Sequence, residues 1–253
     1  MTGSLKAQIR RLLPRAIRSH AILAGPLQGA FIYTSWHNYP GAVLGTTEKP
    51  LLEWFQRNVC SGETWIDIGA HYGYTAIALC RLVGLQGRVF AFEPVLSTAG
   101  CIERTRELNK LHQLQILPLG LGSCLALESR RLPVTRGMAD STIGQGCREE
   151  TISVASFDTI WRLLCEQEPT VHGIKIDVQG MELEVMEGMR QTLRAWHPKL
   201  IVEFHAGVDR AQALELLTSC GYSVPGIPID PAPNELPYPD DKSYLFLNEC
   251  VGI

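Results

Sequence analysis

Residues 64–73 read TWIDIGAHYG, and this stretch decides the fold that the sequence predicts. A short apolar strand carries Asp67, a turn follows at Gly69, and residues 74–83 have the nearly all-apolar composition of a helix packed on a sheet. Glycines in such a turn let the backbone approach a ligand closely, and the first helical turn offers free N–H groups. The stretch therefore predicts a strand–turn–helix unit with a ligand site at its turn.

Strand and helix patterns alternate along the rest of the chain. Strands are expected at 88–94, 114–122, 171–178, 199–205 and 243–249, and helices at 97–110, 157–166, 182–195 and 209–219. This alternation predicts an α/β fold in which a mostly parallel sheet has helices on both faces. Residues 226–242 are too rich in proline to form a crossover helix, so the last strand is expected to run antiparallel.

Two regions depart from this rhythm. Residues 1–60 are expected to form an N-terminal extension of helix and loop, packed on a domain that spans residues 61–253. Within that domain, residues 124–156 contain two short β-prone runs on either side of a polar segment at 135–150. This pattern predicts an inserted hairpin whose loop is a mobile lid over the bound substrate.

The composition is that of an ordinary globular protein. Of the 253 residues, 45% are hydrophobic and 19% are charged, which excludes general disorder. The formal net charge of −3 gives no overall field for nucleic acid, so no nucleic-acid partner is expected. No apolar run reaches the roughly 20 residues that cross a bilayer.

The N-terminus and the cysteines indicate a cytoplasmic protein. The first residues lack the apolar run and cleavage site of a secretory signal. Residues 5–18 mix arginines with apolar residues, which fits a helix docked on the domain better than one lying on a membrane surface. The eight cysteines include no CxxC pair and are expected to be reduced thiols.

A second acidic residue indicates a nucleoside ligand. Glu93 ends the next predicted strand, where a carboxylate in a doubly wound fold accepts hydrogen bonds from ribose hydroxyls. The turn after Asp67 lacks the GxGxxG spacing that cradles a pyrophosphate. A nucleoside that lacks a pyrophosphate and carries positive charge near an acid fits best, and S-adenosylmethionine has both properties.

Four motifs resemble one methyltransferase family. DIGAHYGYTAI at 67–77, AFEP at 91–94, IKIDVQGMELEVMEG at 174–188 and IVEFH at 201–205 are similar to the FkbM family of S-adenosylmethionine-dependent methyltransferases, over roughly residues 41–247. The resemblance implies a Rossmann-like class I methyltransferase fold with a seven-stranded sheet, and methyl transfer, usually to a hydroxyl oxygen. Family members usually carry an acid where this chain has Gln179.

The resemblance also implies which residues contact the cofactor. These residues belong to the glycine turn and to the end of the following strand: Asp67, Gly69, Ala70, His71, Tyr72, Gly73 and Glu93.

Catalytic candidates follow from the expected sheet. Asp177, Glu203 and His205 end two predicted strands, and ligands of open α/β sheets bind at the carboxyl ends of strands. We expect these residues to meet Asp67 at one edge. His205 is the first candidate for the base that takes a hydroxyl proton, because an unperturbed imidazole titrates near neutral pH. A structural role for His205, and a purely orienting role for Asp177, remain open.

The same three residues offer oxygen and imidazole ligands of a kind that magnesium or manganese accepts. Their spacing does not require an ion, and no metal is predicted.

The sequence thus predicts an S-adenosylmethionine-dependent O-methyltransferase. Its acceptor is expected to be a hydroxyl on a small molecule or on a glycan- or lipid-linked molecule, bound near residues 31–47 and 135–150. A nucleotide-dependent oxidoreductase and a non-catalytic module that keeps the fold are the alternatives. Neither the acceptor nor the oligomeric state follows from the sequence.

Overall fold

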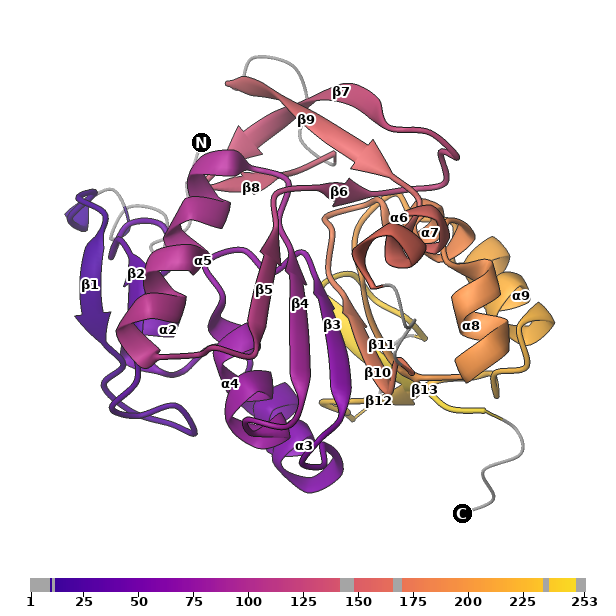
Figure 1. Ribbon diagram of the computed structural model, residues 1–253, viewed down its shortest axis with the longest axis horizontal. Helices are drawn as coiled ribbons and strands as arrows, with labels where there is room; N and C mark the ends of the chain where they lie inside the picture. The colour runs from indigo at the N-terminus through magenta and orange to yellow at the C-terminus, as the bar shows by residue number, and fades with distance from the viewer. Residues whose placement is uncertain (1–9, 11, 142–147, 166–169, 234–236, 249–253) are drawn as a thin grey trace.

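A seven-stranded sheet forms the centre of the computed structural model, which describes residues 10, 12–141, 148–165, 170–233 and 237–248 (Figure 1). The strand order is β12-β13-β11-β10-β3-β4-β5. The strands are β3 (Thr64–Ile68), β4 (Arg88–Phe92), β5 (Leu114–Leu117), β10 (Gly173–Ile176), β11 (Lys199–Phe204), β12 (Ile227–Pro228) and β13 (Lys242–Phe246).

The pairing confirms the predicted fold. Strands β11, β10, β3, β4 and β5 are mutually parallel, whereas β13 pairs antiparallel with β11. Every residue of β3 is buried, as expected for a central strand that is covered on both faces. This arrangement is the Rossmann-like class I methyltransferase fold with an antiparallel last strand.

Helices cover both faces of the sheet. One face carries α3 (Lys49–Asn58), α4 (Tyr74–Val83) and α5 (Leu96–Asn109). The other carries α6 (Phe157–Leu164), α7 (Glu182–Glu187), α8 (Arg190–Trp196) and α9 (Arg210–Ser219). The hydrophobic core is therefore divided by the sheet into two apolar clusters.

The N-terminal region contains a hairpin as well as helices. Strand β1 (Arg18–Ala21) pairs antiparallel with β2 (Phe31–Thr34), and the short helix α2 (Pro40–Leu44) follows. The hairpin is fixed on α5, because the backbone N–H of Tyr33 donates to the Thr105 hydroxyl at 3.0 Å. Within the basic segment 5–18, residues 5–9 and 11 lie outside the described residues.

The insertion forms a second sheet above the carboxyl ends of the central strands (Figure 1). Its order is β6-β9-β7-β8, from β6 (Gly120–Leu121), β9 (Glu149–Ala155), β7 (Glu128–Thr135) and β8 (Met138–Ala139). Residues 142–147, which form part of the predicted lid, lie outside the described residues. The described part of the insertion forms a roof over the edge of the sheet where the ligand site was predicted.

Three predicted elements differ from the structure. The helix predicted at 182–195 is divided into α7 and α8, because the chain passes close to Gly122 at Gly188: a Cβ on Gly188 would lie 1.9 Å from the Gly122 carbonyl oxygen. The last strand ends at Phe246, before the predicted 249. The strand predicted at 114–122 is divided into β5 and β6, which belong to different sheets.

In the described part of the chain, no helix combines the length and apolar character that crossing a membrane requires.

Candidate active site

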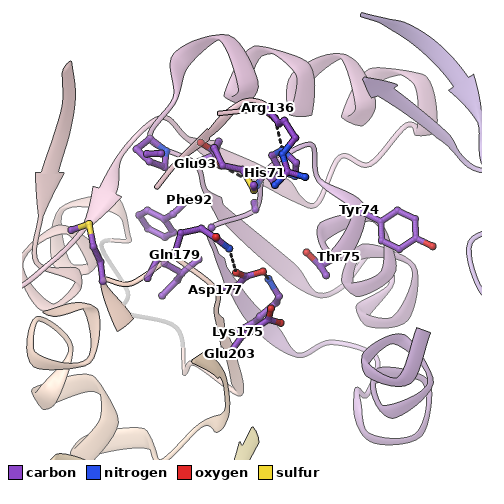
Figure 2. A pocket seen from close by; sticks show the side chains of 18 of the residues that line it. His71, Tyr74, Thr75, Phe92, Glu93, Arg136, Lys175, Asp177, Gln179 and Glu203 are labelled. Carbon is purple, nitrogen blue, oxygen red and sulfur yellow. Dashed lines mark hydrogen bonds and ion pairs between the residues drawn. The ribbon is translucent and has the colours of Figure 1, made fainter. Parts of the chain in front are cut away.

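A cavity of about 450 Å³ opens at the carboxyl ends of β3, β4, β10 and β11 (Figure 2). The insertion sheet contributes Leu132, Met138 and Ile152 to its wall. The N-terminal region contributes Tyr39 and Glu48. The insertion and the N-terminal region, which both depart from the strand–helix alternation, therefore form part of the wall of a cavity at the edge of the central sheet.

The glycine turn is held against two neighbouring strands. The backbone N–H groups of Gly69 and Ala70 donate to the Phe92 carbonyl at 3.0 and 3.1 Å. Gly69 has φ +80°, and a Cβ there would lie 1.7 Å from the backbone oxygen of Asp177. Only glycine fits between β3 and β10 at this point. Asp177 therefore lies beside the glycine turn, at the edge of the sheet where it was expected to meet Asp67.

Glu93 links the end of β4 to the glycine turn. Its Oε2 accepts from the His71 backbone N–H and its Oε1 from that of Val95, both at 2.9 Å. The residue is only 3% exposed, and burial raises the pKa of this carboxyl to about 8, although both backbone donors act in the opposite direction. Each oxygen keeps a further lone pair for a ligand hydroxyl.

The predicted cofactor contacts fall into two groups. Gly69, Ala70, His71 and Glu93 line the cavity, but Asp67, Tyr72 and Gly73 do not. The buried Asp67 accepts from the Thr75 hydroxyl at 2.6 Å.

Tyr72 and Gly73 face other parts of the protein. Tyr72 lies under the insertion, where a Cβ on Gly137 would be 2.7 Å from its hydroxyl, and Gly73 faces the side chain of Ile102. The structure therefore places Asp67, Tyr72 and Gly73 behind the cavity wall, where they support the turn.

A buried lysine, which the sequence analysis did not single out, lies at the floor of the cavity. The Lys175 ammonium is 3.0 Å from Asp177 Oδ2 and 3.8 Å from Asp67 Oδ1, and its side chain is 3% exposed. Burial favours the neutral amine, but the carboxylates of Asp177, Asp67 and Glu48 raise the pKa of Lys175 above its ordinary value. A charged residue inside the apolar run VHGIKIDV was the available signal.

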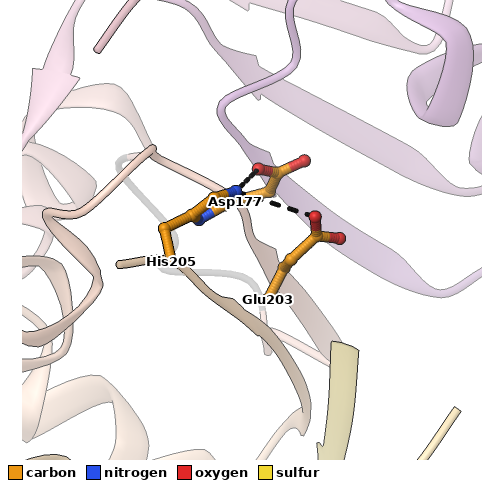
Figure 3. A group of neighbouring side chains, drawn as sticks. All are labelled: Asp177, Glu203 and His205. Carbon is orange, nitrogen blue, oxygen red and sulfur yellow. Dashed lines mark ion pairs between the residues drawn. The ribbon is translucent and has the colours of Figure 1, made fainter. Parts of the chain in front are cut away.

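His205 lies among acidic side chains (Figure 3). Its Nδ1 is 2.7 Å from Oε1 of the fully buried Glu182, and its Nε2 lies 3.6 to 3.8 Å from oxygens of Asp177, Glu203 and Asp241. Burial acts to lower the pKa of His205, but the hydrogen bond to Glu182 and the surrounding carboxylates raise it to about 9. Glu182, which also accepts from the Gly180 backbone N–H at 3.1 Å, thus orients this imidazole.

Gln179 connects the catalytic candidates to the insertion. Its Nε2 is 2.7 Å from His205 Nε2 and 3.3 Å from Asp177 Oδ1, while its backbone oxygen accepts from the Ser141 hydroxyl at 2.8 Å. This amide orientation matches a neutral His205 that carries its proton on Nδ1. When Nε2 is protonated, a rotated amide presents its oxygen instead.

The predicted meeting of Asp177, Glu203 and His205 is confirmed by geometry, since their ligand atoms lie within 4.8 Å of one another. Glu203 Oε2 also accepts from the Ser243 hydroxyl at 2.9 Å. The Lys175 ammonium, 3.0 Å from Asp177 Oδ2, provides positive charge beside this cluster.

Comparison with known proteins gives one family match. The model described as "Methyltransferase FkbM domain" matches residues 67–224. The hexuronic acid methyltransferase AglP of Haloferax volcanii is 30% identical over 160 residues, which cover 62% of this chain and 62% of that protein. The match thus spans less than two thirds of that relative's length.

Solved structures share the fold. The methyltransferase FkbM from Methylobacillus flagellatus KT has a TM-score of 0.50 and 18% identity, covering 83% of this chain and 52% of its own. Fibrillarin from Aeropyrum pernix, solved with natively bound S-adenosyl-L-methionine, has a TM-score of 0.50 and 14% identity, covering 92% and 88%.

Proposed function

Because the chain belongs to the FkbM methyltransferase family, we propose that it transfers a methyl group from S-adenosylmethionine to a hydroxyl oxygen. The observation that carries this proposal is that the glycine turn, Glu93 and the Asp177–His205 cluster all open into one cavity. The acceptor is a hydroxyl on a small molecule or on a glycan- or lipid-linked molecule. The name of the Haloferax relative supports a sugar acceptor.

The cavity fits the charge and shape of this cofactor. Gly69 and Ala70 present an open backbone, and the free lone pairs of Glu93 suit the ribose hydroxyls. Four acidic groups surround Lys175 near the floor: Glu48, Asp67, Asp177 and Glu203. The cations there are Lys175 and, when its imidazole is protonated, His205. The excess of carboxylates favours a cationic ligand.

His205 is the proposed base, with Glu182 as its orienting partner. Bound S-adenosylmethionine supplies an electrophilic methyl group. His205 Nε2 would accept the hydroxyl proton as the acceptor oxygen bonds to the methyl carbon, whose bond to sulfur breaks and leaves S-adenosylhomocysteine. Glu182 would stabilise the resulting imidazolium through Nδ1–H. For this step, the Gln179 amide must leave the Nε2 lone pair to the acceptor. Asp177, held by Lys175 and Gln179, remains an ionised neighbour.

A titration distinguishes the proposal from its main rival. We expect S-adenosylhomocysteine to bind one site per chain and NADH to leave that site free. Incubation with cofactor carrying a labelled methyl group and a panel of sugars then tests for transfer to a hydroxyl oxygen by mass spectrometry. Binding of NADH without binding of S-adenosylhomocysteine would identify a nucleotide-dependent oxidoreductase instead. Cofactor binding without methyl transfer, either to a sugar of the panel or to any component of a cell extract incubated in the same way, would favour a non-catalytic module.

A further inference from the structure

One arginine is held at the rim of the cavity by a strained turn. Arg136 lies between β7 and β8 with φ +50°, a left-handed conformation that is unfavourable for a residue other than glycine. Its backbone oxygen accepts from His71 Nε2 at 3.0 Å, and the next carbonyl, of Gly137, accepts from the Thr98 hydroxyl at 2.7 Å. The turn between β7 and β8 is thus fixed both to the glycine turn after β3 and to α5, and Arg136 lies beside His71 (Figure 2).

Among the residues that the structure describes, none neutralises the charge of Arg136 by direct contact. Arg10 lines the same cavity, and within the described residues neither guanidinium makes a hydrogen bond or an ion pair. Partial burial and the positive charge of Arg10 lower the pKa of Arg136, whereas Asp140 acts in the opposite direction. Burial lowers the pKa of His71 to about 4, so this ring adds no charge at pH 7.

The other arginines of the insertion differ from Arg136. Arg130 pairs with Glu184 at 2.6 Å, Arg131 with Glu149 at 3.3 Å, and Arg148 with Glu150 at 3.0 Å. Among the described arginines of this insertion, the one that faces the cavity is therefore the one without a carboxylate partner in contact.

We propose that Arg10 and Arg136 form a subsite for a carboxylate at the rim of the cavity. Guanidinium groups bind carboxylates through parallel hydrogen bonds, and such a ligand would relieve the repulsion between the two arginines. This inference rests on the proposed function, which offers two sources of a carboxylate: the amino-acid part of the cofactor, or an acidic acceptor such as a sugar acid. The carboxylates at the floor would bind a positively charged part of the ligands, and the two arginines at the rim would bind a negatively charged part.

Calorimetry with three probes tests the subsite. S-adenosylhomocysteine carries the amino-acid carboxylate, 5′-methylthioadenosine lacks it, and sodium glucuronate provides a sugar acid. Each is titrated into the wild type, Arg136→Gln, Arg136→Lys and Arg10→Gln, with glucuronate tested in the presence and absence of S-adenosylhomocysteine. Arg131→Gln is the matched control, because Arg131 lies on the same insertion but pairs with Glu149 and is 72% exposed.

Loss of a charge-assisted hydrogen bond corresponds to a drop in affinity on the order of 10–100-fold. If the cofactor supplies the carboxylate, Arg136→Gln weakens S-adenosylhomocysteine by this factor and leaves 5′-methylthioadenosine unchanged. If the acceptor supplies it, the same variant weakens only glucuronate. In either case Arg136→Lys retains part of the affinity, and Arg131→Gln binds like the wild type.

The subsite is overturned if neither S-adenosylhomocysteine nor glucuronate depends on Arg136 or Arg10. Unchanged binding of 5′-methylthioadenosine shows that each variant is folded. If the wild type binds neither nucleoside, the proposed function fails, whereas glucuronate binding that depends on Arg136 would still support the anion subsite.

Discussion

At the scale of single residues, the chemistry depends on the protonation of His205. A base must be unprotonated to accept a proton, and the neighbouring carboxylates raise the pKa of His205 to about 9. We therefore expect the turnover rate to rise with pH through about 9. His205→Ala should lower turnover by about 10²–10⁴-fold, remove this pH limb and leave the affinity for S-adenosylhomocysteine unchanged. Near-normal turnover of the variant on a sugar hydroxyl would move the base to Asp177 or water.

Substitutions at two neighbours of His205 should shift the pH dependence of turnover in opposite directions. Gln179→Glu places a carboxylate beside Nε2, which stabilises the imidazolium and should move the pH limb to higher pH. Glu182→Gln removes the negative charge beside Nδ1 and should move the limb to lower pH. Gln191→Glu on the surface of α8, where Gln191 contacts Arg162, is the control. Shifts of the same sign in both variants would contradict the assigned contacts; the pKa of His205 is measured directly by NMR.

At the scale of secondary-structure elements, substitutions at two glycines separate the effect of a steric clash on stability from the effect of helix propensity. Gly188→Ala places a Cβ 1.9 Å from the Gly122 carbonyl and should destabilise the junction of α7 and α8. Gly100 lies inside α5 with nothing within 4 Å of its ideal Cβ, so Gly100→Ala should stabilise the fold by about 0.5–1 kcal/mol. Urea denaturation measures both changes. Equal effects of the two substitutions would show that the contact at Gly122 carries no energetic weight.

The junction of α7 and α8 shows which features could not be predicted from the sequence. Alternating strands and helices, the glycine turn and the strand-end acids follow local patterns, and the sequence predicts them. The glycine at 188 is a local signal for a possible break, but the contact with Gly122 that fixes the break involves a segment far away in the sequence. The role of Glu182 likewise requires the position of β11 relative to α7. Lys175 was visible as a charge in an apolar strand, but its partner Asp67 follows only from the register of β3 and β10.

At the scale of the whole molecule, the insertion and the sheet meet over the cavity. Ser141 donates to the Gln179 backbone, and Arg136 accepts from His71, so the described part of the insertion contacts the site at two points. We predict that residues 135–150 close over the bound acceptor. Hydrogen exchange should show protection of this segment when S-adenosylhomocysteine and acceptor are both present. Unchanged exchange in the ternary complex would count against a lid.

The central claim, that this cavity binds S-adenosylmethionine with Glu93 at the ribose, is tested most directly by calorimetric titration of S-adenosylhomocysteine into wild type and Glu93→Ala. Removing the Glu93 carboxyl leaves the ribose hydroxyls without their acceptor and should weaken binding by about 1–3 kcal/mol. Glu107→Ala on the exposed face of α5 is the control, since Glu107 pairs only with Arg104 among the described residues. The account predicts tight binding to the wild type and to Glu107→Ala and clearly weaker binding to a folded Glu93→Ala protein. Equal affinity of all three would contradict it.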